Sequence, residues 1–118
     1  MEEAPLIIKD FLNYMLTIKG KSKNTVKEYF YDLRLFLRFI KMERKLTVET
    51  DIDKVDIGDV DIDLIRTITL SDLYSFMSYI SRERDNHANS RARKVASIKS
   101  FYNYLTSKAR LLDYNPAS

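Results

Sequence analysis

The amino-acid sequence contains no cysteine, a single histidine, and only two glycines and two prolines. Without cysteine there is neither a disulfide framework nor a thiolate site for a metal, which favours an intracellular compartment. No apolar run approaches the roughly 20 residues that span a membrane. The acidic start at Glu2 and Glu3 is unlike that of a signal peptide. These absences predict a cytoplasmic protein that does not enter a membrane.

Residues suited to catalysis are also scarce. The single histidine, His87, stands in a polar stretch beside Asn86 and Asn89, and no serine has an evident base partner. The acidic stretch that begins at Asp51 does not match a calcium-binding loop, because its twelfth position, which should be glutamate, is Ile62. We therefore expect no catalytic residues, no metal, no cofactor and no small-molecule substrate for this chain.

The chain is long and apolar enough for one modest core. Its 118 residues, 45% of them hydrophobic, predict a single domain over residues 1–118. The formal net charge of +3 hides a polarised distribution, because residues 19–48 carry +6, residues 49–72 carry −6 and residues 82–110 carry +6. This asymmetry indicates a polyanionic partner on one side of the molecule. The alternative is that the basic helices are merely solvated.

Apolar residues recur three and four positions apart over long stretches, which is typical of helices. We expect an all-α domain whose four main helices run from Pro5 to Gly20, from Ser22 to about Arg44, from Thr69 to the polar run 85–89, and from Ser90 to beyond Leu105. Ser22 and Ser90 are predicted N-caps, and Thr69 with Asp72 resembles a capping box. Asn115 and Pro116 close the domain.

Residues 46–66 are the segment whose structure the pattern leaves open. Aspartate alternates with isoleucine and valine from Asp51 to Asp63, which suits an exposed strand as well as a loop. We interpret the segment as a solubilising acidic connection with one short turn around residues 64–67. Its negative charge would also keep this side of the domain away from DNA.

The starts of the second and fourth helices combine small polar side chains with cations, an arrangement that suits contacts to phosphate. Arg93, Ser97 and Ser100 are expected to share a face outside the apolar stripe. Most aromatic residues are assigned to the core, and Tyr31 is the surface aromatic that could contact phosphate. The alternative, that Ser22 and Ser90 are caps only, is compatible with this. The candidate DNA contacts are Ser22, Lys23, Asn24, Thr25, Lys27, Tyr31, Ser90, Arg91, Arg93, Lys94, Ser97 and Lys99.

Several of these elements together resemble the N-terminal core-binding domain of tyrosine recombinases, the phage-integrase and Xer-type enzymes. The resemblance is carried by residues 22–25 (SKNT), by Tyr29, Asp32, Leu33 and Phe36, and by residues 69–76 at the start of the third helix. It continues through residues 93–102 (RKVASIKSFY) with Leu105, and ends on residues 115–117 (NPA). These elements span nearly the whole chain in the family's order.

This resemblance implies a SAM-like bundle of four or five helices that forms one half of a clamp around duplex DNA. It implies that a catalytic domain follows residue 118, so that the catalytic residues are not in this chain, and that the longer protein assembles on DNA as a homo-tetramer. Two features depart from the family pattern: residues 46–66 are longer and more acidic, and Lys99 stands where arginine is typical, which removes bidentate geometry. A helical protein-interaction module that binds no DNA is the competing interpretation.

Overall fold

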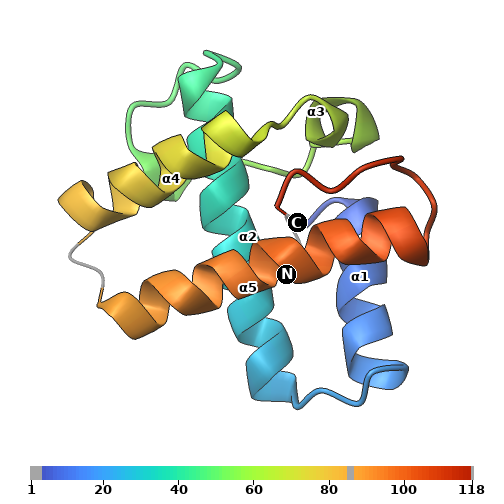
Figure 1. Ribbon diagram of the computed structural model, residues 1–118. Helices are drawn as coiled ribbons and strands as arrows, with labels where there is room; N and C mark the ends of the chain where they lie inside the picture. The colour runs from blue at the N-terminus through green and yellow to red at the C-terminus, as the bar shows by residue number, and fades with distance from the viewer. Residues whose placement is uncertain (1–3, 85–86, 118) are drawn as a thin grey trace. The chain divides into compact units, whose positions relative to one another are not determined.

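Five α-helices and one short 3-10 helix make up the regular structure of the computed structural model, which describes residues 4–84 and 87–117 (Figure 1). The helices are α1 (Leu6–Thr17), α2 (Lys23–Glu43), η1 (Ile52–Lys54), α3 (Ile62–Arg66), α4 (Leu70–Glu83) and α5 (Ala88–Ser107). No strand occurs among the described residues, so the all-α prediction is confirmed. The chain divides into two compact units, residues 1–62 and residues 63–118, and each is described by itself.

In the first unit, α1 and α2 run in opposite directions from a short connection (Figure 1). Gly20 turns the chain in this connection at φ +66°, a left-handed conformation that costs glycine little. The helix before it ends at Thr17, earlier than predicted, and Pro5 is its N-cap. The rings of Phe11 in α1 and Tyr29 in α2 stack with centroids 6.3 Å apart. Buried side chains at helical spacing therefore join the two helices as the apolar pattern predicts.

The acidic segment is bound to α2 by two buried cationic side chains. Arg38 donates from Nε to the Val55 carbonyl at 2.8 Å, and Lys41 donates from Nζ to the Asp56 carbonyl at 2.8 Å and to Asp59 Oδ1 at 2.7 Å. The aliphatic residues that alternate with the acids, Val55, Ile57 and Val60, are buried. The prediction of a merely solvated acidic connection is therefore wrong, because its apolar residues belong to the core.

The second unit contains α4, α5, most of α3 and the C-terminal segment. The expected turn near residues 64–67 is α3, which begins at Ile62. Two tyrosines donate hydrogen bonds to the last two carbonyls of α3. Tyr102 donates from Oη to the Ile65 carbonyl, and Tyr114 donates from Oη to the Arg66 carbonyl, both at 3.0 Å. These bonds fasten the α3 turn to α5 and to the segment that follows α5.

The start of α4 is as predicted and the start of α5 is not. The capping box of Thr69 and Asp72 is present, with each side chain accepting from the other residue's backbone N–H. The helix α5 begins at Ala88 with His87 as N-cap, so Ser90 lies in the first turn and is not the cap. Ala88 and Asn89 are helical, whereas Asp85 and Asn86 of the expected break lie outside the described residues. The His87 side chain makes no capping hydrogen bond to this helix start.

Candidate nucleic-acid interface

The start of α2 is the best formed of the predicted contact sites. The Ser22 side chain accepts a hydrogen bond from the Thr25 amide at 3.1 Å and donates one to Thr25 Oγ1 at 3.0 Å. The predicted cap is therefore confirmed. A helix start also has amides without an intrahelical partner, and these carry the positive end of the helix dipole. Lys23, Asn24 and Lys27 are exposed around this start, where an anion such as phosphate would be stabilised.

Four side chains of α2 lie along one side of the helix. At about 100° per residue they project within roughly a quarter of the helix circumference. We call this set the α2 cationic row, and it consists of Lys23, Lys27, Tyr31 and Arg34. The Tyr31 side chain is 45% exposed, and the Arg34 guanidinium lies 4.9 Å from its ring centroid and 5.3 Å from that of Phe30. These cation–π contacts hold the guanidinium against the helix and orient it within the row.

Sequence reasoning missed Arg34 and two lysines before α2. Arg34 follows Lys27 by seven residues and Tyr31 by three, so helical spacing alone could have placed it on the same side. Lys19 and Lys21 are exposed in the connection that precedes α2. Residues 19–27 thus contain four lysines and no acid. This local excess of positive charge attracts a polyanion more strongly than the net charge of the chain suggests.

The predicted contacts on α5 do not form one face. Arg91 and Arg93 are half-exposed and Lys99 is exposed, and their side chains project in directions at least about 80° apart around the helix. One straight duplex surface therefore cannot meet all three equally. Ser90 is half-exposed in the first turn of α5.

Two predicted α5 contacts lie inside the protein. Ser97 is 0% exposed and donates from Oγ to the Arg93 carbonyl at 3.0 Å, while Lys94 is 8% exposed. The expectation that Ser97 shares an open face with Arg93 and Ser100 is therefore wrong. The helix backbone supplies the hydroxyl with a partner, so a serine can be buried without an unsatisfied donor.

The part of the chain that the structure describes offers neither a metal-binding cluster nor a helix suited to span a membrane. Within residues 4–84 and 87–117 there is no group of three or more histidine, cysteine or acidic side chains that could hold a metal ion. His87 is exposed at the start of α5. Among these same residues, no helix combines the length and the apolar character needed to cross a membrane.

The sequence is similar to known proteins over most of its length. The sequence matches the family described as phage integrase, N-terminal SAM-like domain, over residues 7–109. It is 51% identical over 113 residues to the tyrosine recombinase XerC of Caldanaerobacter subterraneus subsp. tengcongensis, a match that covers 95% of this chain and 32% of that relative. It is also 31% identical over 99 residues to the tyrosine recombinase XerD of Listeria monocytogenes, covering 84% of this chain and 28% of that relative.

A third relative, the tyrosine recombinase XerC of Myxococcus xanthus, is 32% identical over 114 residues, which cover 97% of this chain and 31% of the relative. The chain thus spans 28–32% of the length of these three recombinases. No solved structure matches the chain. The family match extends from α1 to the end of α5 and the chain is all-helical, as the resemblance implied. The chain therefore belongs to the phage integrase N-terminal SAM-like domain family.

Proposed function

We propose that the chain is the DNA-binding part of a site-specific tyrosine recombinase, and that it binds duplex DNA mainly through phosphates. The observation that carries the proposal is the α2 cationic row beside an open helix start, with Lys19 and Lys21 in the connection before it. Phosphate contacts position a protein on the duplex, and helix starts and lysines are common donors for them. Similarity to proteins named tyrosine recombinases supports the recombinase part of the proposal.

The contacts of this proposal are exposed and half-exposed residues at the start and in the first half of α2, and along α5 as far as Lys99. They are Ser22, Lys23, Asn24, Thr25, Lys27, Tyr31 and Arg34 on α2, with Ser90, Arg91, Arg93 and Lys99 on α5. Lys99 supplies charge without the bidentate geometry of arginine, so it suits a phosphate better than a guanine edge. Strand cleavage and rejoining are assigned to residues outside these 118, in a longer protein that acts on DNA as a homo-tetramer.

The proposal is tested by fluorescence anisotropy with a labelled duplex over a series of salt concentrations. Non-specific binding by such a fragment has a Kd of about 10⁻⁴ to 10⁻⁶ M at physiological salt. Lys23→Ala and Lys27→Ala should each weaken binding on every duplex sequence and reduce the salt slope by about one. The matched control is Lys9→Ala, an exposed lysine on α1 outside the row, which should leave the slope unchanged.

Two results would contradict the proposal. The first is an absence of binding at low salt, which would favour the protein-interaction module. The second is an equal loss for Lys9→Ala and Lys27→Ala, which would show that affinity depends on total charge and not on the α2 cationic row.

A further inference from the structure

Two consecutive aromatic residues of α2 form a platform within the first unit, which we call the α2 aromatic platform. Phe30 is 2% exposed, whereas Tyr31 is 45% exposed. Their ring centroids lie 5.7 Å apart, and the ring planes are tilted by 49°. Because Phe30 is packed into the core, it fixes the inner half of the platform. The Tyr31 ring extends the platform toward solvent.

Arg34 lies over this platform. Its guanidinium carbon is 4.9 Å from the Tyr31 ring centroid and 5.3 Å from the Phe30 ring centroid, and both distances are within the roughly 6 Å of a cation–π contact. The contacts follow from helical spacing, because long side chains of a helix lean toward its start and meet residues three and four positions earlier. A guanidinium held by two rings loses less conformational entropy on binding than a lysine ammonium on a flexible stem.

The guanidinium of Arg34 combines fixed placement with a planar set of donors. The rings cover the side that faces the helix, and the residue is half-exposed, so a ligand reaches it from solvent. A guanidinium has five N–H donors, so some serve a ligand even where others bond within the protein. Two parallel donors fit a ligand with two neighbouring acceptors, and the N7 and O6 atoms of guanine form such a pair in the major groove.

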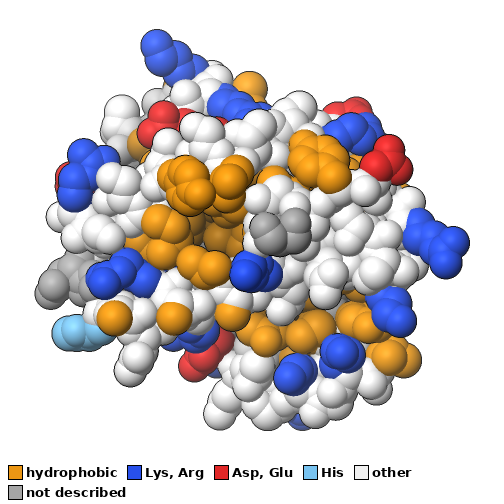
Figure 2. All heavy atoms as spheres, in the orientation of Figure 1, with side chains coloured by type: hydrophobic (Ala, Val, Ile, Leu, Met, Phe, Trp, Pro, Cys, Tyr) orange, Lys and Arg blue, Asp and Glu red, His pale blue; other side chains and the backbone are white. Residues whose placement is uncertain are grey.

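The surroundings of Arg34 differ from those of the lysines at the start of α2. Lys23 and Lys27 are exposed near helix amides that also attract phosphate, and Figure 2 shows Lys and Arg side chains gathered below, over the α1–α2 connection. Arg34 lies about 16 Å further along the helix than Lys23, where the dipole of the helix start no longer acts. Attraction to phosphate is therefore strongest at the helix start, whereas Arg34 offers the fixed geometry that base recognition requires.

We propose that Arg34 is a specificity-determining residue that recognises guanine through N7 and O6 in the major groove, and that Tyr31 positions it. The inference rests on the proposed function, because it names the feature of DNA that one member of the α2 cationic row recognises. Lysine cannot replace Arg34 in this role, since it keeps the charge and lacks the planar pair of donors. The ring of Tyr31, and not its hydroxyl, supplies the positioning.

Selection from a library of randomised duplexes by the 118-residue chain tests this role, followed by fluorescence anisotropy on single duplexes. The wild type should enrich guanine at one position, and adenine at that position should weaken binding at least about fivefold. A deazaguanine that lacks the N7 acceptor should also weaken binding, whereas inosine, which keeps N7 and O6, should bind as guanine does. Arg34→Lys should lose these differences and keep the wild-type salt slope, because its charge is unchanged.

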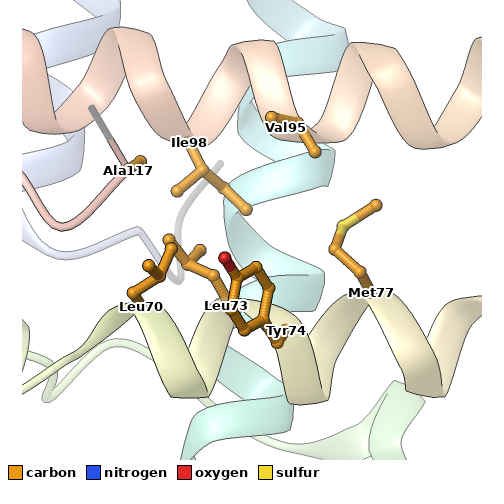
Figure 3. Close-up of a pocket in the computed structure, with 7 residues that line it drawn as sticks. All are labelled: Leu70, Leu73, Tyr74, Met77, Val95, Ile98 and Ala117. Atoms are coloured by element: carbon orange, nitrogen blue, oxygen red, sulfur yellow. The ribbon is translucent and has the colours of Figure 1, made fainter.

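Variants of Tyr31 test the positioning. Tyr31→Phe keeps the ring and should retain the guanine preference, whereas Tyr31→Leu removes the ring and should reduce the preference at least about twofold without changing the salt slope. The matched control is Tyr74→Leu, because Tyr74 is another exposed tyrosine. It lies on α4 in a pocket whose lining residues are all apolar or aromatic, beside Leu70 and Met77 (Figure 3). Its replacement should leave the guanine preference unchanged.

The proposed function and this inference fail in different ways. A wild type that binds every duplex with the same affinity and a clear salt slope would overturn the inference and leave the proposed function intact. The same holds if Arg34→Lys keeps the guanine preference, or if Tyr31→Leu keeps it in full. A wild type that binds no duplex at low salt would overturn both.

Discussion

Replacing Lys41 by methionine tests whether the acidic segment is part of the folded first unit. The Lys41 side chain is buried, and its ammonium bonds to the Asp56 carbonyl at 2.8 Å and to Asp59 Oδ1 at 2.7 Å. Methionine keeps an unbranched apolar stem of similar length and removes the charge and the donors. The substitution therefore isolates the two polar contacts from the packing of the side chain.

The expected loss of stability follows from these two contacts. A hydrogen bond that involves a charged group contributes about 1.5–3 kcal/mol, whereas an exposed ion pair contributes about 0.2–1 kcal/mol. The Asp59 carboxylate is largely exposed, so its share belongs to the lower range. We expect Lys41→Met to lower the free energy of unfolding by about 2–3 kcal/mol and Asp59→Asn to lower it by about 0.5 kcal/mol.

Urea denaturation followed by circular dichroism measures both values, and pH adds an internal check. The hydrogen bond from Lys41 holds the pKa of Asp59 below its ordinary 3.8. The ion pair therefore stabilises the fold above that pH, and its contribution is lost as the pH falls through the lower folded-state pKa. The difference between Asp59→Asn and wild type should accordingly shrink as the pH falls through 3.8 and below it. A loss below about 0.5 kcal/mol for Lys41→Met would refute the anchoring of the segment.

Two further substitutions test the second unit by the same denaturation assay. Thr69→Ala removes the capping box of α4 and should lower the free energy of unfolding by about 1 kcal/mol. Ser71→Ala, two residues later at an exposed position, is the control, and equal losses for the two variants would count against the cap. Tyr102→Phe removes the buried hydrogen bond to the Ile65 carbonyl and should lower the free energy of unfolding by about 1–2 kcal/mol. Tyr114→Phe removes an exposed hydrogen bond and should lower it by less. A larger loss for Tyr114→Phe than for Tyr102→Phe would be inconsistent with this geometry.

Local signals in the sequence were sufficient for most of the helices. The caps at Ser22 and Thr69 are formed by side chains that bond to the backbone three residues away, so no distant residue is needed to recognise them. The spacing of apolar residues likewise identified α2 and the buried positions Ile98, Phe101 and Leu105 of α5. Periodicity and capping are properties of neighbouring residues, and these features are therefore readable without the tertiary structure.

The predictions that were wrong concern residues whose burial depends on a hydrogen bond that the sequence pattern does not reveal. Val55 and Ile57 look like part of a solvated acidic stretch until Arg38 and Lys41 supply cations for the carbonyls beside them. Ser97 was expected on an open face because helical spacing places it beside Arg93 and Ser100, yet a bond to its own helix allows it to be buried. Neither partnership leaves a mark in the local pattern.

The first basic block, residues 19–48, therefore contains both buried and exposed cations, which a count of charges in the sequence cannot distinguish. Arg38 and Lys41 are buried and bond to the acidic segment, so they release no counterions when DNA binds. Lysines such as Lys27 remain exposed and can do so. We expect Lys41→Met, measured where the variant is still folded, to leave the salt slope of DNA binding unchanged although it removes a positive charge. Lys27→Ala should lower that slope by about one without loss of stability, and an equal slope change for the two variants would refute this division.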